Sequence, residues 1–448
     1  MSSTLNNESI LLYRNNFSKR DNNVALNSVS NNNLNDVALN RENYQQISHI
    51  FSHRVKNEGK VTNQKSSGRC WIFAALNMMR LPTMEKYNLE NDFEFSQSYV
   101  FFWDKLERCN YFLECIYNTI ESERDSREIK HLLTDPLCDG GQWDMFVNIV
   151  EKYGLVPKSV YNESHNSSNS RRMNWVLTYK LREYACIIRE KSENGSKKEL
   201  KDKFMSEIYE ILCIFLGEPP SKFNWEYYDK NKEYHRVKGM TPLEFYNNLS
   251  IKCNDYYCLI HDPRNEYNKC YSVKYLGNVV EGRKIKYINL PIEEIKKYAV
   301  KSIKENESVW FGCDVGKWFE RKKCVMDTDV FNYEEIFNTE FGLNKRERLN
   351  YGESLMTHAM LFTGLDCEEE NNTVKNETET IVNKWRVENS WSESGPAKGY
   401  YIMTDKWFDE YVYEVVLHKK HLNEGEIREL NEGEVKTFPP WDPFGALA

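Results

Sequence analysis

The sequence predicts an α+β protein with a mainly helical first half and a second half of short strands. Two observations indicate this: apolar residues follow helical spacing in segments up to Leu216, and short β-like runs follow Cys253. The 448 residues are 40% hydrophobic and 14% aromatic, which provides a sizeable core and excludes global disorder. This length predicts two or three domains, or one core with large insertions.

The first half is predicted to hold an arm and a helical core. Residues 1–60 are Asn-rich and polar, with a short helical stretch at Ile10–Phe17, and are expected to form an N-terminal arm. Residues 61–160 are predicted to be the helical half of the core. The small, polar segment Asn63–Gly68 leads into an apolar helix that starts at Cys70. Further helices are predicted at Ser96–Glu107 and Gln142–Tyr153.

Residues 161–265 are predicted to be a mainly helical insertion. Arg171–Leu216 has helical periodicity with mixed charges, whereas Ser159–Ser170 is rich in Ser and Asn and is predicted to be a surface loop. The aromatic tract Phe223–Tyr228 is expected to pack the insertion against the core rather than to stack nucleic-acid bases.

Residues 266–448 are predicted to be the β-rich half. The acidic segment Cys367–Thr380 interrupts it and is expected to be an exposed hairpin loop. The predicted strands lie at Tyr271–Tyr275, Lys284–Leu290, Ser308–Val315, Ala359–Leu365, Ile381–Glu388 and Gly399–Thr404.

Charge and cysteine usage limit the class of protein. A net charge of −8 argues against a chain held to nucleic acid by its overall charge. No apolar run reaches the roughly 18 residues of a membrane span, and the first residues lack the apolar core of a signal peptide. The twelve cysteines are widely scattered, so we expect reduced thiols and a cytoplasmic location.

Cys70 is the candidate nucleophile. A thiol at a helix N-terminus lies at the positive end of the helix dipole, which favours the thiolate needed for covalent catalysis. Gln64, on the preceding loop, can donate its amide to an oxyanion beside the Cys70 backbone N–H. Gly68 lets the loop pass close to a substrate. The alternative is a buried structural cysteine.

His358 and Asn389 are the candidate partners of the thiol. Imidazole titrates in the range that a base for a thiol requires, and an Asn can hold its tautomer. Trp391 can shield the His–Asn hydrogen bond from water. Taken singly, His358 is better explained as a core histidine, and the alternative for Asn389 is a turn residue.

In combination, the order Gln64, Cys70, His358, Asn389 resembles papain-like cysteine peptidases. The chain from Cys70 to His358 is about twice as long as in papain relatives, which implies large insertions into a papain-like core. One branch is closer still. The segments Asn63–Arg80, Asp139–Lys158, Lys384–Trp391 and Pro440–Ala448 resemble the bleomycin hydrolase and aminopeptidase C family. One departure is Ser392, where papain relatives usually have Gly.

The resemblance implies a thiol aminopeptidase that needs no cofactor or metal and acts on peptides, with bleomycin-like amides as further candidate substrates. It also implies a homohexamer with active sites facing an internal chamber, and substrate-binding roles for Gly140, Gly141 and Trp391. The C-terminal tail is expected to lie in the cleft, where the carboxylate of Ala448 would pair with the α-ammonium group of a peptide. Only one substrate residue would then fit before the nucleophile.

Three alternatives remain open at this point. The chain could be a catalytically silent, ring-forming scaffold of the same fold, or a thiol acyltransferase or deamidase. Cys253, Cys258, His261 and Cys270 could also be considered zinc ligands, but their spacing matches no standard zinc motif and core thiols explain them better.

Overall fold

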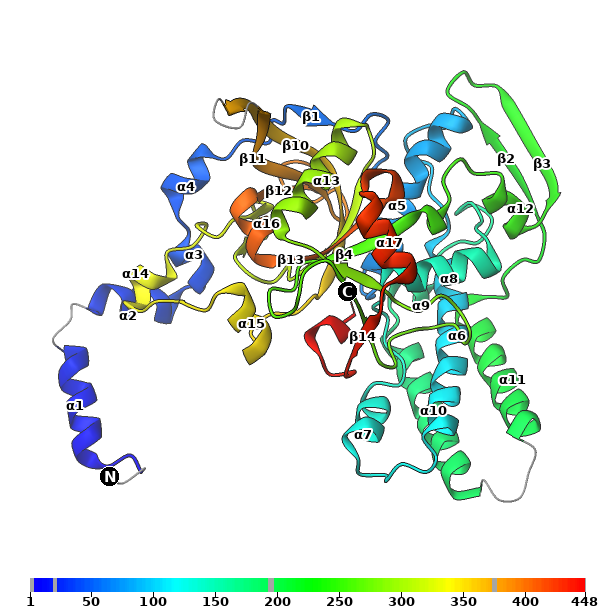
Figure 1. Cartoon of the computed structure of the whole chain (residues 1–448), viewed down its shortest axis with the longest axis horizontal. Helices are drawn as coiled ribbons and strands as arrows, with labels where there is room; N and C mark the ends of the chain where they lie inside the picture. Colours follow the sequence, from blue (N-terminus) through cyan, green and yellow to red (C-terminus); the bar gives the residue numbers. More distant parts are fainter. Residues whose placement is uncertain (1–3, 19–21, 192–196, 373–376, 448) are drawn as a thin grey trace.

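Helix α5 (Cys70–Lys86) lies between a helical half and a large sheet (Figure 1). Its sequence is apolar almost throughout, and all but a few of its residues are buried. The structure, a computed structural model, describes residues 4–18, 22–191, 197–372 and 377–447. Within these ranges no helix is long and apolar enough to cross a lipid bilayer.

The helical half packs around α5. Trp71, Phe101, Trp143 and Phe146 are fully buried in the core that α5 shares with its neighbours. The helices of this half are α6 (Gln97–Asn118), α7 (Arg127–Thr134), α8 (Trp143–Tyr153), α9 (His165–Ser168), α10 (Arg171–Lys191), α11 (Lys197–Leu216) and α12 (Pro242–Asn247).

The predicted insertion contains α9, α10 and α11 and a separate hairpin of β2 (Phe223–Tyr228) and β3 (Tyr234–Met240). Trp225 is buried and makes edge contacts with the rings of Tyr87 and Phe245. The expectation that the aromatic tract packs the insertion against the core is therefore confirmed.

The surface-loop prediction for Ser159–Ser170 is wrong in part. The segment contains α9, whose start is closed by reciprocal hydrogen bonds between Ser164 and Ser167, and both Ser167 and Ser170 are buried. Small polar residues form a buried turn here because nearby charged side chains accept their hydroxyl protons.

The second half forms a 12-stranded sheet in the order β14-β5-β6-β4-β13-β7-β10-β11-β12-β9-β8, with β1 paired to β10. Its strands are β1 (His53–Arg54), β4 (Tyr256–Ile260), β5 (Lys269–Val273), β6 (Tyr287–Asn289), β7 (Val309–Cys313), β8 (Phe319–Glu320), β9 (Val325–Met326), β10 (His358–Asn372), β11 (Glu377–Glu388), β12 (Tyr400–Thr404), β13 (Val412–His418) and β14 (Val435–Phe438).

The acidic segment predicted to be a hairpin loop is largely paired. Strands β10 and β11 continue into it as a regular antiparallel ladder, with Glu368 opposite Ile381 and Glu369 opposite Thr380. Residues 373–376 of the predicted loop lie outside the described residues.

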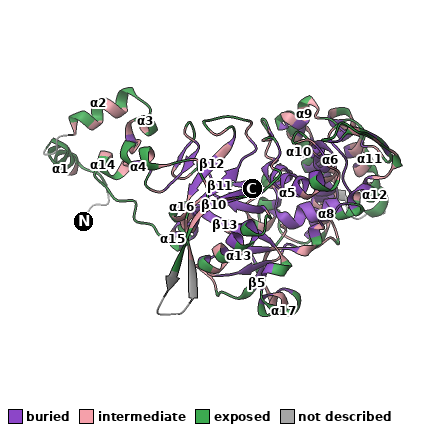
Figure 2. Cartoon of the chain, turned by 90° about the horizontal axis from the view of Figure 1, so that it is seen from above, coloured by how far each residue is buried: buried purple, intermediate pink, exposed green. Residues whose placement is uncertain are grey.

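The remaining helices cover the sheet or extend away from it. They are α13 (Ile292–Lys304), α14 (Tyr333–Phe337), α15 (Lys345–Tyr351), α16 (Asp405–Tyr411) and α17 (Glu424–Glu432), with 3₁₀ turns at Cys253–Asp255, Lys419–His421 and Pro443–Gly445. The arm helices are α1 (Asn7–Ser18), α2 (Asn23–Asn31), α3 (Leu34–Ala38) and α4 (Arg41–Gln46). The arm projects from the body, and its surface is mainly exposed (Figures 1 and 2).

Candidate active site

The cysteine predicted to be the nucleophile is the first residue of α5, at the junction of the two halves. Its backbone N–H lies in the first helical turn, where amides have no intrahelical partner. A cavity of about 1210 Å³ opens here, and Gln64, Gly68, Cys70 and His358 all contribute to its wall. The fold thus places the candidate nucleophile and the candidate base, which are far apart in the sequence, at the wall of one cavity.

His358 begins β10, and Asn389 directly follows the end of β11. The two strands are antiparallel neighbours, which places the two side chains together. The Nε2 atom of His358 lies 2.9 Å from Oδ1 of Asn389. The same Oδ1 accepts the backbone N–H of Ser390 at 2.8 Å, which identifies it as the oxygen of the amide. Nε2 is therefore the protonated nitrogen, and the lone pair is on Nδ1.

Gln64 is held by hydrogen bonds to two residues, two of them through its side chain and one through its backbone N–H. Its Oε1 accepts the hydroxyl of Ser390 at 2.6 Å, and its Nε2 donates to the Ser67 carbonyl at 2.7 Å. Its backbone N–H donates to the Ser390 carbonyl at 2.9 Å. A primary amide has two N–H donors, so one remains for a ligand in the cavity that Gln64 lines. This is the donor that an oxyanion requires.

Burial controls the charge of the two reacting groups. It raises the pKa of Cys70 to about 11, although the backbone N–H groups of Ala359 and Trp71 point at the sulfur and oppose this. Burial also lowers the pKa of His358 to about 4, although the hydrogen bond that its Nε2–H donates to Asn389 opposes this. The Cys70 thiol and the His358 imidazole are therefore both neutral when each is considered singly. A thiolate and an imidazolium form when a proton passes from the sulfur to the imidazole.

Trp391 lies against His358. The centroids of the His358 and Trp391 rings are 4.9 Å apart, with planes tilted by 34°. The guanidinium carbon of Arg321 lies 5.5 Å from the centroid of the Trp391 ring. Ser392, where papain relatives usually have Gly, has φ 69°. The turn thus keeps the left-handed backbone that glycine adopts most easily, at the cost of some strain in a serine.

Of the two glycines predicted to bind substrate, only Gly140 is among the described residues of the cavity wall. Its carbonyl accepts a hydrogen bond from Arg108. At Gly141 a Cβ would lie 2.4 Å from the Trp71 ring, so the absence of a side chain there permits close packing behind the wall.

The last described residue of the chain lies at the same cavity. Leu447 contributes to its wall, and the carbonyl of Ala446 accepts from Gln142 Nε2 at 2.8 Å. Two contacts anchor the segment before them: Asp442 pairs with Arg264 at 2.9 Å, and Trp441 stacks under Arg127 at 3.9 Å. Ala448, predicted to bind substrate, lies outside the described residues.

Asp139 is a member of the site that sequence reasoning missed. It lines the cavity, accepts the Gly68 N–H at 3.1 Å and pairs with buried Lys105 at 2.7 Å. Burial raises the pKa of this carboxyl, but Lys105 and the hydroxyl of Ser170 outweigh it and hold the pKa well below its usual range. Its position next to two glycines was the available signal, yet only the fold reveals its partners.

Helix α10 forms another part of the wall. The side chains that it contributes recur every three or four residues, as expected for one helical face. They are Arg171, Asn174, Trp175, Thr178, Tyr179, Arg182, Glu183, Cys186 and Ile187. The insertion thereby shapes the cleft.

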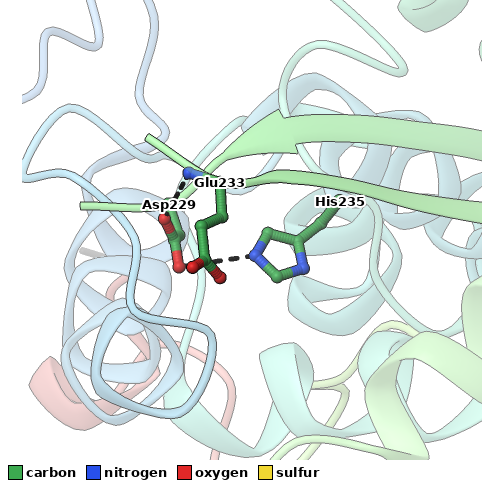
Figure 3. Close-up of side chains that lie close together, drawn as sticks. All are labelled: Asp229, Glu233 and His235. Carbon is green, nitrogen blue, oxygen red and sulfur yellow. Dashed lines mark hydrogen bonds and ion pairs between the residues drawn. The ribbon is translucent and has the colours of Figure 1, made fainter. Parts of the chain in front are cut away.

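A group of potential metal ligands lies elsewhere, at the turn between β2 and β3 (Figure 3). One oxygen of Asp229 accepts the backbone N–H groups of Asn231 and Glu233 at 2.9 Å. The other faces Asn88 at 3.2 Å and His235 Nε2 at 3.4 Å. The Asp229 carboxylate thus closes the turn and ties it to Asn88, in the loop after α5. None of the three potential ligand residues is among the described residues of the cavity wall.

The cysteines considered as zinc ligands are core residues. Cys253, Cys258 and Cys270 are all buried, and the ring of His261 contacts the Leu290 carbonyl at 3.1 Å. Among the described residues no disulfide joins any of the cysteines.

Comparison with known proteins assigns the family. The model of the Peptidase C1-like family matches residues 4–445. Bleomycin hydrolase of Rattus norvegicus is 49% identical over 438 residues, which is 95% of this chain and 94% of the relative. Aminopeptidase C of Listeria innocua is 43% identical over 425 residues, 94% of this chain and 93% of the relative. The crystal structure of PepW from Lactobacillus rhamnosis superposes with a TM-score of 0.95 at 40% identity, covering 100% of both chains.

These matches extend over almost the whole chain, at identities that leave no other family open, and they confirm the predicted papain-like α+β fold. The protein belongs to the bleomycin hydrolase and aminopeptidase C group of cysteine peptidases, within the Peptidase C1-like family.

Proposed function

We propose that Cys70, His358, Asn389 and Gln64 carry out the thiol aminopeptidase reaction of this family. The observation that carries the proposal is the 2.9 Å contact between His358 Nε2 and Asn389 Oδ1. It leaves Nδ1 as the basic nitrogen in a cavity whose wall also contains Cys70. A thiol, a base and an orienting amide are the groups that covalent amide hydrolysis requires.

In the first step, the thiol proton passes to Nδ1 of His358 while the sulfur of Cys70 forms a bond to the substrate carbonyl carbon. The carbonyl oxygen becomes negative and accepts the free N–H of Gln64 and the backbone N–H of Cys70. The imidazolium then returns its proton to the departing amine, and the C–N bond breaks. A thioester between Cys70 and the N-terminal residue of the peptide remains.

In the second step, His358 removes a proton from water, and the hydroxide oxygen forms a bond to the thioester carbonyl. Collapse of this intermediate breaks the C–S bond, and the proton returns to the sulfur. The free amino acid leaves, and the enzyme is restored. Asn389 contacts the imidazole in both steps and stabilises its protonated form, as the third group of the unit.

The tail accounts for release of single N-terminal residues. Leu447 lines the cavity, and Gln142, Arg264 and Arg127 anchor the residues just before it through the contacts described above. A peptide that enters this cleft is stopped by the tail after its first residue. Ala448 is the proposed contact of the peptide's α-ammonium group, and Gly140 and Trp391 the proposed further substrate contacts.

The remaining expectations also belong to this proposal. A homohexamer would cover the arm, where α1 has no buried residue and Leu11, Leu12 and Phe17 are exposed. Sedimentation equilibrium gives the mass of the assembly directly.

Reduced thiols support a cytoplasmic location. Bleomycin-like amides are candidate substrates because relatives named bleomycin hydrolase cover the chain.

Hydrolysis in H₂¹⁸O tests the reaction. We expect one ¹⁸O atom in the released N-terminal amino acid, no turnover of an N-acetylated copy of the peptide, and no change in a side-chain amide. Transfer of the residue to an added amine without ¹⁸O uptake would show an acyltransferase. Conversion of Gln to Glu with an intact peptide would show a deamidase.

A further inference from the structure

A set of buried polar side chains lies behind the nucleophile. Asn77 follows Cys70 by two turns of α5, about 10 Å along the axis, and Arg80 lies roughly one turn further on. Asn77 is 3% exposed, Arg80 1% and Glu388 2%. Side chains this polar are found in a protein interior only where the fold supplies partners for them.

The first link of this set joins the helix to the strand that presents Asn389. Glu388 is the last residue of β11 and directly precedes Asn389. Its Oε1 atom accepts the amide of Asn77 at 3.0 Å and the guanidinium of Arg80 at 2.6 Å. The helix that begins at Cys70 is thereby fixed to the end of the strand that leads into Asn389.

The second link joins the same helix to the loop of Gln64. Arg80 Nη1 donates to the Lys60 carbonyl at 2.8 Å, and Asn77 Nδ2 donates to the Thr62 hydroxyl at 3.0 Å. The guanidinium packs so closely on Gly59 that a Cβ there would lie 2.5 Å from Arg80 Cζ. Both links therefore share the same two side chains of α5.

The buried side chains of Asn77, Arg80 and Glu388 are not well suited to stabilising the fold alone. Removing two charges from water is costly, and buried ion pairs are often replaceable by apolar residues without loss of stability. Here Arg80 Nε and Glu388 Oε2 have no hydrogen-bond partner among the described residues. Burial raises the pKa of Glu388 to about 7 even though Arg80 lies beside it. The property that apolar residues could not reproduce is the directed attachment of three segments to one another.

We propose that Asn77, Arg80 and Glu388 are positioning residues that fix Cys70, Gln64 and Asn389 relative to one another. This inference rests on the proposed roles of those three residues. The positioning residues are not among the described residues of the cavity wall, so they act on the reaction only through the groups that they hold. Displacement of a catalytic group by about 1 Å can reduce the rate about 100-fold.

The test is steady-state kinetics of Glu388→Gln, which keeps the size of the side chain and removes its charge. We expect kcat to fall about 10- to 100-fold while KM changes less than about threefold, because binding surfaces stay in place. The double variant Arg80→Met/Glu388→Met leaves no unpaired charge and is expected to remain folded, with an equally reduced kcat. It keeps the test valid if the single variant does not fold.

Glu58→Gln is the matched control. The Glu58–Arg386 pair also joins the loop before Gln64 to β11, with side chains 13% and 8% exposed, but neither residue belongs to α5. We expect its kcat to stay within about threefold of wild type. A wild-type kcat in the double variant, or an equal loss in Glu58→Gln, would overturn the inference. Cys70→Ala is assayed in parallel to separate failure of this inference from failure of the proposed function. An active Cys70→Ala variant would mean that the proposed function is wrong, whereas an inactive one leaves only the positioning role in question.

Discussion

The hydroxyl of Ser390 donates to Oε1 of Gln64 across 2.6 Å, although 326 positions separate the two residues in the chain. This contact fixes the orientation of the Gln64 side-chain amide and joins the loop before Cys70 to the turn after Asn389. With Gln64 as the proposed oxyanion donor, we expect the two residues to act as one unit and each to contribute to the rate.

Gln64→Ala is expected to lower kcat about 10²- to 10³-fold, the usual loss for one oxyanion donor. Ser390→Ala should lower kcat less, by about tenfold, because it releases the orientation of the amide and leaves the donor itself in place. Steady-state kinetics on a peptide with a free N-terminus measure both. A larger loss in Ser390→Ala than in Gln64→Ala would contradict the assignment of the donor.

His358→Ala is expected to be as damaging as loss of Cys70, because the two act as one unit and their losses are not additive. Asn389→Ala should cost less, since it removes the partner that holds the imidazole and not the base itself. Kinetics of the three single variants and the Cys70/His358 double variant provide the comparison. The roles would be wrong if Asn389→Ala proved more severe than His358→Ala.

The pH profile of kcat/KM should be a broad bell. The reaction needs one proton shared by the pair: a second proton blocks the base, and loss of the last one leaves no acid for the leaving amine. Burial lowers the pKa of His358 to about 4 and raises that of Cys70 to about 11, so the two limbs move apart. We therefore expect a plateau through neutral pH. A narrow peak, or a steady rise into strong base, would contradict this.

Glu414 makes stability depend on pH. Burial raises its pKa from 4.5 to about 8, so the folded state binds this proton more tightly than the unfolded state. The contribution of Glu414 to the free energy of unfolding is then fully present below pH 4.5 and is lost as the pH rises toward 8, by at most about 1.4 kcal/mol per pH unit. Urea unfolding of wild type and Glu414→Gln between these limits should show wild type declining relative to the variant. Parallel curves would refute the prediction.

Removal of Ala446–Ala448 should widen the specificity. Without these residues the end of the cleft is open, so longer stretches of peptide can extend past Cys70. Mass spectrometry of the products should show slower release of single residues, together with internal cleavage and attack on N-acetylated peptides. The tail would have no such role if the shortened enzyme still released residues one at a time and still rejected acetylated peptides.

Much of this site was accessible from the sequence because its chemistry is concentrated in short motifs. Cys70 with Gln64, and Asn389 with Trp391, lie in continuous segments whose residue types and order indicate the reaction. The fold class follows from the same segments. The partners that hold them do not, since Asp139–Lys105 and Glu388–Arg80 are contacts between elements far apart in the chain. A single charged residue in a sequence does not reveal whether it will be exposed or paired in the core.

The buried turn at Ser167 and Ser170 shows the same limit. Ser and Asn are typical of surface loops, but the Ser167 hydroxyl donates to the nearby Glu163 carboxylate, and the Ser170 hydroxyl donates to Asp139, which the fold brings beside it. Composition predicted exposure, whereas the buried turn satisfies these hydroxyls with one local and one tertiary hydrogen bond.

The proposed reaction begins with attack by the sulfur of Cys70 on the peptide carbonyl. Aminopeptidase activity of Cys70→Ser tests it most directly, with Cys138→Ser as the control because Cys138 lines the same cavity without standing at a helix start. We predict that Cys70→Ser keeps the fold and assembly of wild type and loses turnover, because a hydroxyl lacks the nucleophilicity of a thiolate. Cys138→Ser should retain activity. Turnover by Cys70→Ser near the wild-type rate would show that the sulfur of Cys70 is not the attacking group.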